Sequence, residues 1–395
     1  MSLRVLVVDD TVTFRKIVSE AMAAIPGVEV VGTAHHGKMA LARIQDLKPD
    51  LVTLDIEMPE MDGLEVLQAI RSQGINVGVI MVSSFTRRGS ELTIRALELG
   101  AFDFITKGSE GSFDQNKEAI RSALTPLVKA FSQRKDIRAI LQGSQPFTTT
   151  HQSTPQTTHA PARPTTVEPY AIKTPTTVAP PVSPLAKTRP ELVLIGVSTG
   201  GPNALAKVIP ALPGNLGVPV LIVQHMPPMF TATLAESLNK QSALHVKEAE
   251  HNEIALPNTV YIAPGGKQMK ISGQAGSILI QITDDPPENN CKPSVDTLFR
   301  SAALHFPGRV CAVIMTGMGA DGALGLRLIK RNTARVIAQD EASCVVFGMP
   351  KEAIATGVVD VISPLDAIAG EIRKAVQGIL PYQTGNTTPS MKDSA

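Results

Sequence analysis

The chain has 395 residues and a formal net charge of +1 at pH 7. Hydrophobic residues make up 43% and charged residues 18%, which is the balance of a soluble globular protein. This length allows two or three domains, each with a core of its own. The near-zero charge gives no indication of a surface for nucleic acid or membrane lipid.

The cysteines and the start of the chain indicate the compartment. Cys291, Cys311 and Cys344 show no C-x-x-C spacing, so neither a disulfide framework nor a thiolate zinc site is expected. We predict that they are buried small residues without a partner base. No signal peptide precedes the first strand-like segment, and no apolar run is long enough to span a bilayer. We therefore expect a soluble cytoplasmic protein that does not insert into membranes.

The first 125 residues alternate short apolar runs with amphipathic segments, of which Thr13–Ala24 and Leu64–Ser72 have helical spacing. Residues Val79–Val82 are apolar on both faces, which is typical of a central strand in a parallel sheet. The pattern predicts a doubly wound α/β domain over residues 1–125. The expected strands are Leu3–Val8, Val28–Gly32, Leu51–Leu54, Val77–Val82 and Phe102–Ile105.

Residues 126–190 are expected to form a helical extension followed by a linker. Residues 146–190 contain ten Pro and twelve Thr in 45 positions, with almost no large aliphatic residues. Such a segment cannot bury enough apolar surface to offset its ordering entropy, so we predict an extended, partly polyproline linker. A separate fold must therefore lie on each side of it.

Residues 191–382 repeat the alternation of apolar runs and helical patterns, which predicts a second, mostly parallel α/β domain. Residues 383–395 are polar and are expected to be a disordered tail. The alternating segment Ser277–Thr283 is expected to pair with residues 259–263 as a hairpin. The expected buried strands are Leu192–Val197, Val218–Val223, Thr259–Ala263, Val310–Met315 and Val336–Ala338.

Polar side chains end four of the five strands expected in the first domain. Asp9 and Asp10 follow the first strand, Asp55 the third, Ser83 the fourth and Lys107 the fifth. A single Asp at a strand end is usually a turn former, but the carboxyl ends of parallel strands share one edge, so these groups are expected to meet. Carboxylates suit Mg²⁺, whereas a lysine and a hydroxyl suit an oxyanion. The set predicts a phosphoryl-transfer site with Asp55 as the nucleophile.

These residues, with the segments Asp-Ile-Glu-Met-Pro (55–59) and Met-Asp-Gly (61–63), resemble the flavodoxin-like receiver domain of two-component response regulators. The resemblance covers residues 1 to about 125 and implies Mg²⁺-dependent phosphorylation by a histidine kinase. It implies these roles: Asp55 as phospho-acceptor; Asp9, Asp10, Asp55 and the backbone carbonyl of Glu57 at the metal; Ser83 and Lys107 at the phosphoryl group; and Phe104 as a switch residue.

The second domain presents a serine at a tight turn. Gly-Val-Ser-Thr-Gly-Gly (196–201) directly follows the expected strand at residues 192–197, and a helical pattern follows it. Ser198 is therefore a candidate nucleophile. An anion-binding loop and a plain turn are the alternatives, because glycines also permit close backbone approach to phosphate. Both glycines follow the serine, and the lysine of a Walker loop is absent.

A histidine and an aspartate follow two further strands of the same domain. His225 comes just after the strand expected at residues 218–223, and Asp321 lies in the glycine-rich loop after residues 310–315. Each alone is more often a loop residue or a turn former. Together with Ser198 they supply a nucleophile, a general base and a carboxylate that orients the base, at one edge of one sheet.

The motifs Gly-Val-Ser-Thr-Gly-Gly, Gln-His-Met-Pro (224–227) and Thr-Gly-Met-Gly-Ala-Asp-Gly (316–322) are similar to those of the chemotaxis protein-glutamate methylesterases, the CheB family. That family has a Rossmann-like catalytic domain, and the resemblance spans both regions of this chain. It implies that Ser198 attacks a glutamate methyl ester, that His225 takes the proton and that Asp321 orients the imidazole. It also implies oxyanion stabilisation by the Met318 N–H and tuning of His225 by Thr199.

The favoured hypothesis is a phosphorylation-activated hydrolase that releases methanol from methylated chemoreceptor cytoplasmic domains in chemotaxis adaptation. Receptor deamidation is a second expected activity, a chemotaxis-type histidine kinase is the expected phosphodonor, and the ester chemistry needs no cofactor. The unphosphorylated receiver is expected to cover the Ser198 edge. Two alternatives are a regulated binding module without turnover and a phosphate sink. A nucleic-acid partner is not expected, because no helix-turn-helix with a basic face follows the linker.

Overall fold

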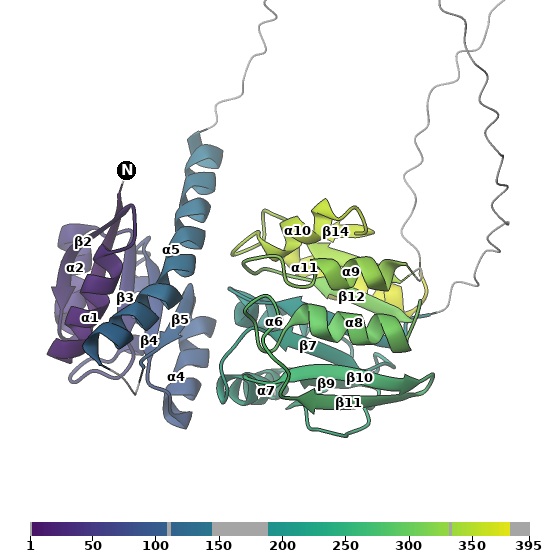
Figure 1. Ribbon diagram of the computed structural model, residues 1–395. Helices are drawn as coiled ribbons and strands as arrows, with labels where there is room; N and C mark the ends of the chain where they lie inside the picture. The colour runs from purple at the N-terminus through teal and green to yellow at the C-terminus, as the bar shows by residue number, and fades with distance from the viewer. Residues whose placement is uncertain (1, 109–111, 144–188, 332–333, 380–395) are drawn as a thin grey trace, which may run out of the picture.

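The computed structural model describes residues 2–108, 112–143, 189–331 and 334–379, and it places two α/β domains side by side (Figure 1). Nearly all of the predicted linker and the whole predicted tail lie outside the described residues. Within the described part of the chain, no helix is both long and apolar enough to cross a membrane.

The N-terminal domain, purple to blue in Figure 1, is a five-stranded parallel sheet with its helices packed around it. Its elements are β1 (Leu3–Val8), α1 (Val12–Ala23), β2 (Val28–Ala34), α2 (Gly37–Leu47), β3 (Leu51–Asp55), α3 (Gly63–Ser72), β4 (Gly78–Ser83), α4 (Arg87–Glu98), β5 (Asp103–Thr106) and α5 (Phe113–Gly143). The strand order β2-β1-β3-β4-β5, parallel at every pairing, confirms the predicted doubly wound fold. The winding changes side between β1 and β3, which opens a crevice at their carboxyl ends.

Helix α5 continues past the domain boundary expected at residue 125. Leu127, Val128 and Ala130 are buried in the same apolar cluster as Ile17 and Val18 of α1. The receiver core therefore includes part of the predicted helical extension.

The C-terminal domain contains a seven-stranded parallel sheet. Its elements are β6 (Leu192–Val197), α6 (Gly201–Val208), β7 (Val220–Gln224), α7 (Phe230–Gln241), β8 (His245–Glu248), β9 (Thr259–Ile262), β10 (Gln268–Gln274), β11 (Ser277–Thr283), α8 (Val295–His305), β12 (Val310–Ile314), α9 (Ala323–Lys330), β13 (Arg335–Gln339), α10 (Met349–Ala355), β14 (Val361–Ser363) and α11 (Leu365–Val376). The strand order is β14-β13-β12-β6-β7-β9-β8. Strands β6, β7 and β12 are buried at every residue, as their continuous apolar sequences predict. After β6 the chain first adds β7 on one side of β6, and later adds β12 on the opposite side. The strand order therefore reverses at β6, and ligands of such sheets bind at this topological switch point.

The predicted pairing of residues 277–283 with residues 259–263 is wrong. Strand β11 pairs antiparallel with β10 in a separate two-stranded sheet, whereas β9 lies between β7 and β8 in the large sheet. Strand β9 is buried at all of its residues, which an interior parallel strand requires. Strand β10 escaped prediction because polar residues and Gly273 interrupt its apolar pattern.

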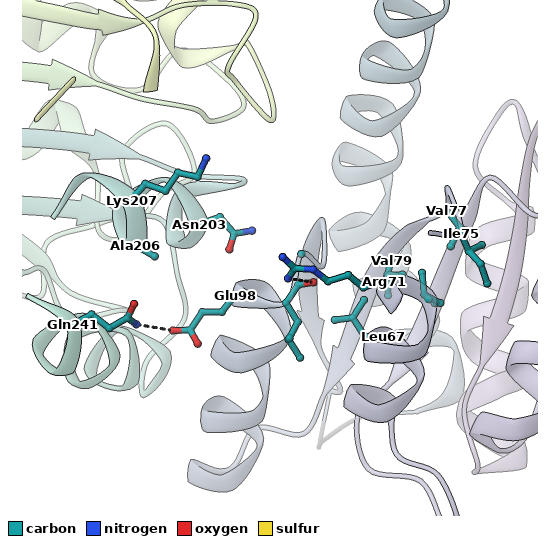
Figure 2. A pocket seen from close by; sticks show the side chains of 13 residues that line it. Leu67, Arg71, Ile75, Val77, Val79, Glu98, Asn203, Ala206, Lys207 and Gln241 are labelled. Carbon is teal, nitrogen blue, oxygen red and sulfur yellow. Dashed lines mark hydrogen bonds between the residues drawn. The ribbon is translucent and has the colours of Figure 1, made fainter. Parts of the chain in front are cut away.

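The two domains meet where α4 packs against α6 and α7. A groove of about 610 Å³ lies at this junction. Residues of α3, β4 and the end of α4 line one side of it, and residues of α6 and α7 line the other (Figure 2). Glu98 at the end of α4 accepts hydrogen bonds from Ser237 and from Gln241, the latter at 3.3 Å. Arg87 at the start of α4 forms an ion pair of 3.8 Å with Glu236 of α7.

Candidate active site and phosphorylation site

Three carboxylates converge at the carboxyl ends of β1 and β3. Asp9, Asp10 and Asp55 bring ligand oxygens within 4.8 Å of one another, and Asp9 and Asp55 are buried while Asp10 is exposed. Lys107 Nζ lies 2.7 Å from Asp55 Oδ2 and 2.9 Å from Asp9 Oδ2. The structure thus brings together four of the predicted receiver residues.

The acidic cluster carries more negative charge than its lysine can balance. Burial raises the pKa of Asp55 to about 6, and Asp9 adds to this rise while Lys107 opposes it. Burial also raises the pKa of Asp9, and its contact with Lys107 opposes this rise. A hard divalent cation with oxygen ligands would neutralise these groups. The residues present therefore fit Mg²⁺.

Ser83 is tied to helix α4. Its hydroxyl donates to the carbonyl of Gly89 at 3.2 Å and accepts from Thr93 Oγ1 at 2.7 Å. In this arrangement the hydroxyl is hydrogen-bonded to residues of α4 and not to Asp55. The carbonyl of Glu57 has no recorded contact among the described residues, so its place at the metal stays a prediction.

Ser198 stands at the carboxyl end of β6 on a sharply turned loop. Its N–H donates to the carbonyl of Thr316 at 3.0 Å, which joins this loop to the one after β12. Gly317 approaches so closely that a Cβ there would lie 2.8 Å from Ser198 Cβ. Gly200 has φ of 76°, a left-handed conformation that turns the chain into α6. The glycines around Ser198 therefore serve the turn and the close approach of two loops.

His225, which is partly buried, and Asp321, which is buried, form a hydrogen-bonded pair. His225 Nε2 lies 2.8 Å from Asp321 Oδ2. Asp321 also accepts from the N–H groups of Val295 at 2.7 Å and Asp296 at 3.0 Å, and from Ser294 Oγ at 2.8 Å. The carboxylate thus sits on the N-terminus of α8, where backbone N–H groups stabilise negative charge. It is held in one orientation toward the imidazole.

The same bonds set the protonation of the pair. Burial alone would raise the pKa of Asp321, but the bonds from His225 and the backbone N–H groups lower it to about 2. Burial lowers the pKa of His225, but its contacts with Asp321 and Cys291 outweigh burial and raise it to about 9. These contacts favour the charged form of each partner, the imidazolium and the carboxylate.

Cys291 departs from the prediction. It is only partly buried, and its Sγ lies 3.6 Å from His225 Nδ1 and 3.4 Å from the carbonyl of Asn289. The prediction that it has no partner base was therefore wrong, because Cys291 and His225 are 66 positions apart and the sequence gives no sign of their contact. Cys311 and Cys344 are buried as predicted, and burial raises the pKa of each thiol to about 12.

Ser198 and His225 follow neighbouring strands, β6 and β7, but the described residues show no hydrogen bond from Ser198 Oγ to the imidazole. Gln224 bridges the two loops, because its Nε2 donates to the Ser198 carbonyl at 3.0 Å and to the His225 carbonyl at 3.1 Å. Because His225 Nε2 is hydrogen-bonded to Asp321, Nδ1 is the nitrogen that can act as the base for Ser198. The Met318 N–H has no acceptor among the described residues.

The receiver contacts the loop that carries Ser198. Asp103 of β5 bonds to the side chain of Thr199, and burial raises the pKa of Asp103 to about 6. The side chain of Thr199 is therefore hydrogen-bonded to this receiver carboxylate and not to His225. The Phe104 ring stacks on that of Phe230 at the start of α7, with centroids 4.7 Å apart and planes inclined by 26°.

An apolar contact extends this interface to the loops that carry Met318 and Val346. Met318, Val345 and Val346 belong to the same apolar cluster as the receiver residues around α1 and α5. The receiver thus packs against loops after β6 and β12 and against α7, all at the edge where Ser198 stands. No local sequence pattern indicates these individual contacts between the two domains.

Comparisons with known proteins agree with this division into domains. Residues 5–120 match the response regulator receiver domain family, and residues 193–372 match the CheB methylesterase family. A protein-glutamate methylesterase/protein-glutamine glutaminase of Desulfotalea psychrophila is 50% identical over 378 residues, covering 95% of this chain and 99% of that protein. A Bacillus subtilis protein with the same name is 42% identical over 376 residues, covering 95% and 99%. The crystal structure of the Thermotoga maritima CheB methylesterase catalytic domain is 42% identical and covers 47% of this chain and 98% of that one, with a TM-score of 0.46.

A receiver domain joined to a catalytic output domain defines a response regulator with enzymatic output. The extent of the identity over almost the whole chain makes the assignment more specific. This chain belongs to the CheB family of protein-glutamate methylesterases/protein-glutamine glutaminases.

Proposed function

We propose that this protein hydrolyses the γ-methyl esters of glutamate side chains on chemoreceptor cytoplasmic domains and also deamidates receptor glutamines. Phosphorylation of Asp55 activates both reactions in chemotaxis adaptation. The observation that carries the proposal is the His225–Asp321 pair, 2.8 Å apart, on the loops beside Ser198 at the switch point of the sheet. The names of two relatives that the chain covers over 99% of their length, protein-glutamate methylesterase/protein-glutamine glutaminase, give the same two activities.

The geometry supports acyl transfer by a serine triad. Ser198 Oγ attacks the ester carbonyl carbon while its proton passes to His225 Nδ1, the nitrogen that Asp321 leaves available. The Met318 N–H is the candidate donor to the oxyanion. The imidazolium then protonates the departing methoxide, and methanol leaves. Water deprotonated by His225 hydrolyses the acyl-serine to glutamate; with a glutamine substrate the first leaving group is ammonia.

The receiver site supports phosphorylation of Asp55. Asp55 supplies the attacking carboxylate oxygen, and Lys107 already lies 2.7 Å from it. Asp9, Asp10 and Asp55, with the carbonyl of Glu57, would hold Mg²⁺, which when bound neutralises charge on the phosphoryl oxygens. A chemotaxis-type histidine kinase is the proposed phosphodonor.

Two contacts are candidates to couple the domains. Ser83 is bonded to α4 and Phe104 is stacked on Phe230, so recruitment of Ser83 to a phosphoryl group at Asp55 would disturb both α4 and the stack. Loss of these contacts would let the receiver move away from Ser198. Coupling thus rests on the packing of α4 against α7 and on the Phe104–Phe230 stack.

Phe104→Ala is expected to raise activity without phosphodonor. A stacked aromatic pair contributes about 0.5–1.5 kcal/mol, so its loss should raise the open population and the basal rate by about two- to tenfold. Phosphodonor should then stimulate the variant by a correspondingly smaller factor. Phe113→Ala, which removes a receiver aromatic at the start of α5, is the matched control. Equal basal rates in Phe104→Ala and wild type would refute this coupling.

The substrate is tested with a methylated receptor cytoplasmic fragment. We expect methanol release from this fragment, none from the same fragment without methyl esters, and ammonia release from a fragment with glutamine at the same sites. Binding of the methylated fragment without methanol release would support a regulated binding module in place of an enzyme.

A further inference from the structure

The thiol of Cys291 and the imidazole of His225 form a contact that the proposed acyl transfer does not use. Sγ lies 3.6 Å from Nδ1, the same nitrogen that the reaction assigns to the proton of Ser198. Nδ1 therefore has two possible partners, a thiol and a hydroxyl. The thiol is the one that the resting structure selects.

The segment that carries Cys291 is held rigidly. Cys291 and Glu288 exchange two backbone hydrogen bonds, at 2.8 and 3.1 Å, across a tight turn. Gln268 Nε2 also donates to the Cys291 carbonyl at 3.3 Å, and Arg300 fixes the Glu288 carboxylate. The position of Sγ beside the imidazole is thus built into the fold.

The separation of the two atoms matches a tetrahedral zinc site. With Zn–S near 2.3 Å and Zn–N near 2.0 Å, sulfur and nitrogen bound to one tetrahedral Zn²⁺ stand about 3.5 Å apart. The observed distance is 3.6 Å. A cation could therefore replace the thiol proton between Sγ and Nδ1 with almost no movement of either side chain.

The second ring nitrogen of His225, Nε2, has the kind of partner that metal-binding histidines usually have. A histidine that binds a metal usually donates its second ring N–H to a carboxylate, which fixes the ring and raises its basicity. His225 Nε2 does this with Asp321, at 2.8 Å, and Asp321 is itself fixed by Ser294 and by the backbone N–H groups of α8. Ligand atoms of His225, Cys291 and Asp321 lie within 4.8 Å of one another.

We propose that Cys291 Sγ and His225 Nδ1 form an inhibitory site for Zn²⁺, with water or Ser198 Oγ in the remaining positions. Binding displaces the thiol proton and any proton on Nδ1 to solvent and involves no oxidation or reduction. The cation takes the nitrogen lone pair that must accept the proton of Ser198, so ester hydrolysis stops while zinc is bound. The inhibition rests on the proposed function, whereas the binding does not.

Binding is tested first, on the full chain without substrate. Co²⁺ is the spectroscopic probe, because a thiolate ligand gives a charge-transfer absorption that Zn²⁺ abolishes by competition. We expect this absorption in wild type and in Cys344→Ser, and none in Cys291→Ser. Cys344 is the matched control because it is buried and its Sγ has no place in the cluster. Absence of the absorption in wild type, or its persistence in Cys291→Ser, would overturn the site.

Inhibition is tested next, by titrating Zn²⁺ into the methanol-release assay. Relative to its own zinc-free rate, Cys291→Ser should need about tenfold more zinc or greater for half-inhibition, while Cys344→Ser should follow wild type. A zinc-selective chelator should restore the rate. Zinc that binds the receiver carboxylates affects all three proteins equally, so it does not change the ratio of their half-inhibiting zinc concentrations. Equal sensitivity in all three would reject the inhibitory role. Cobalt binding through Cys291 without methanol release from wild type would instead reject the proposed function and leave the metal site standing.

Discussion

Replacing Ser198 by alanine is expected to reduce methanol release from methylated receptor by about 10⁴- to 10⁶-fold, which are the losses measured when a serine nucleophile is removed from a triad. The physical reason is that alanine lacks the hydroxyl that forms the acyl intermediate with His225 as its base. Cys291 is the one other nucleophile that touches Nδ1, at 3.6 Å, and its rigid turn places it in a different loop. The rate of methanol release, wild type against variant, is the measurement.

The control for Ser198→Ala is Ser277→Ala, which alters an exposed serine on the β10–β11 hairpin. Both variants should accept phosphate at Asp55 as wild type does, which shows that the receiver is intact. Methanol release by Ser198→Ala within tenfold of wild type would mean that another group is the nucleophile. If only the double variant with Cys291→Ser lost activity, the thiol would be that group.

Replacing Asp321 by asparagine is expected to reduce the rate by about 10⁴-fold, because an amide cannot hold the imidazole in the tautomer that leaves Nδ1 as the base. Ser294 and the N–H groups of Val295 and Asp296 would also lose a charged acceptor. The measurement is the rate of methanol release at the optimum of each protein. Asp284→Asn, an exposed carboxylate with two lysine partners, is the matched control.

The pH profile separates the role of Asp321 in orientation from its role in charge. A general base works in its neutral form, so a raised pKa of His225, about 9, makes the rate fall as pH decreases through that value. Removing the carboxylate removes the leading cause of that rise. The acidic limb of the profile should therefore move to lower pH in Asp321→Asn, while Asp284→Asn keeps the wild-type limb. A limb that stays in place in Asp321→Asn would show that another group controls it.

The receiver site was predictable because each of its residues follows an apolar strand. The edge shared by parallel strands brings Asp9, Asp55 and Lys107 together whatever the detail of the loops. The same logic placed Ser198 and His225 on neighbouring strand ends and put Asp321 in contact with His225. Strand ends in a doubly wound fold are therefore a reliable guide to which groups meet.

The contacts that the sequence did not predict are formed between loops that are distant in sequence. The Ser-Val-Asp run at residues 294–296 has the form of a helix start, but nothing in it indicates that its N–H groups point at Asp321. The partner of Cys291 was hidden in the same way. The stack of Phe104 on Phe230 depends on how two domains dock across a long linker, and no local pattern encodes that contact.

Phosphorylation of Asp55 is expected to accelerate ester hydrolysis at Ser198. The direct test is the rate of methanol release from methylated receptor with and without a small phosphodonor plus Mg²⁺, for wild type and Asp55→Asn. We expect a faster rate with phosphodonor in wild type and a rate that stays at the basal level in Asp55→Asn. Equal stimulation of both proteins, or no effect of the phosphodonor on wild type, would contradict it.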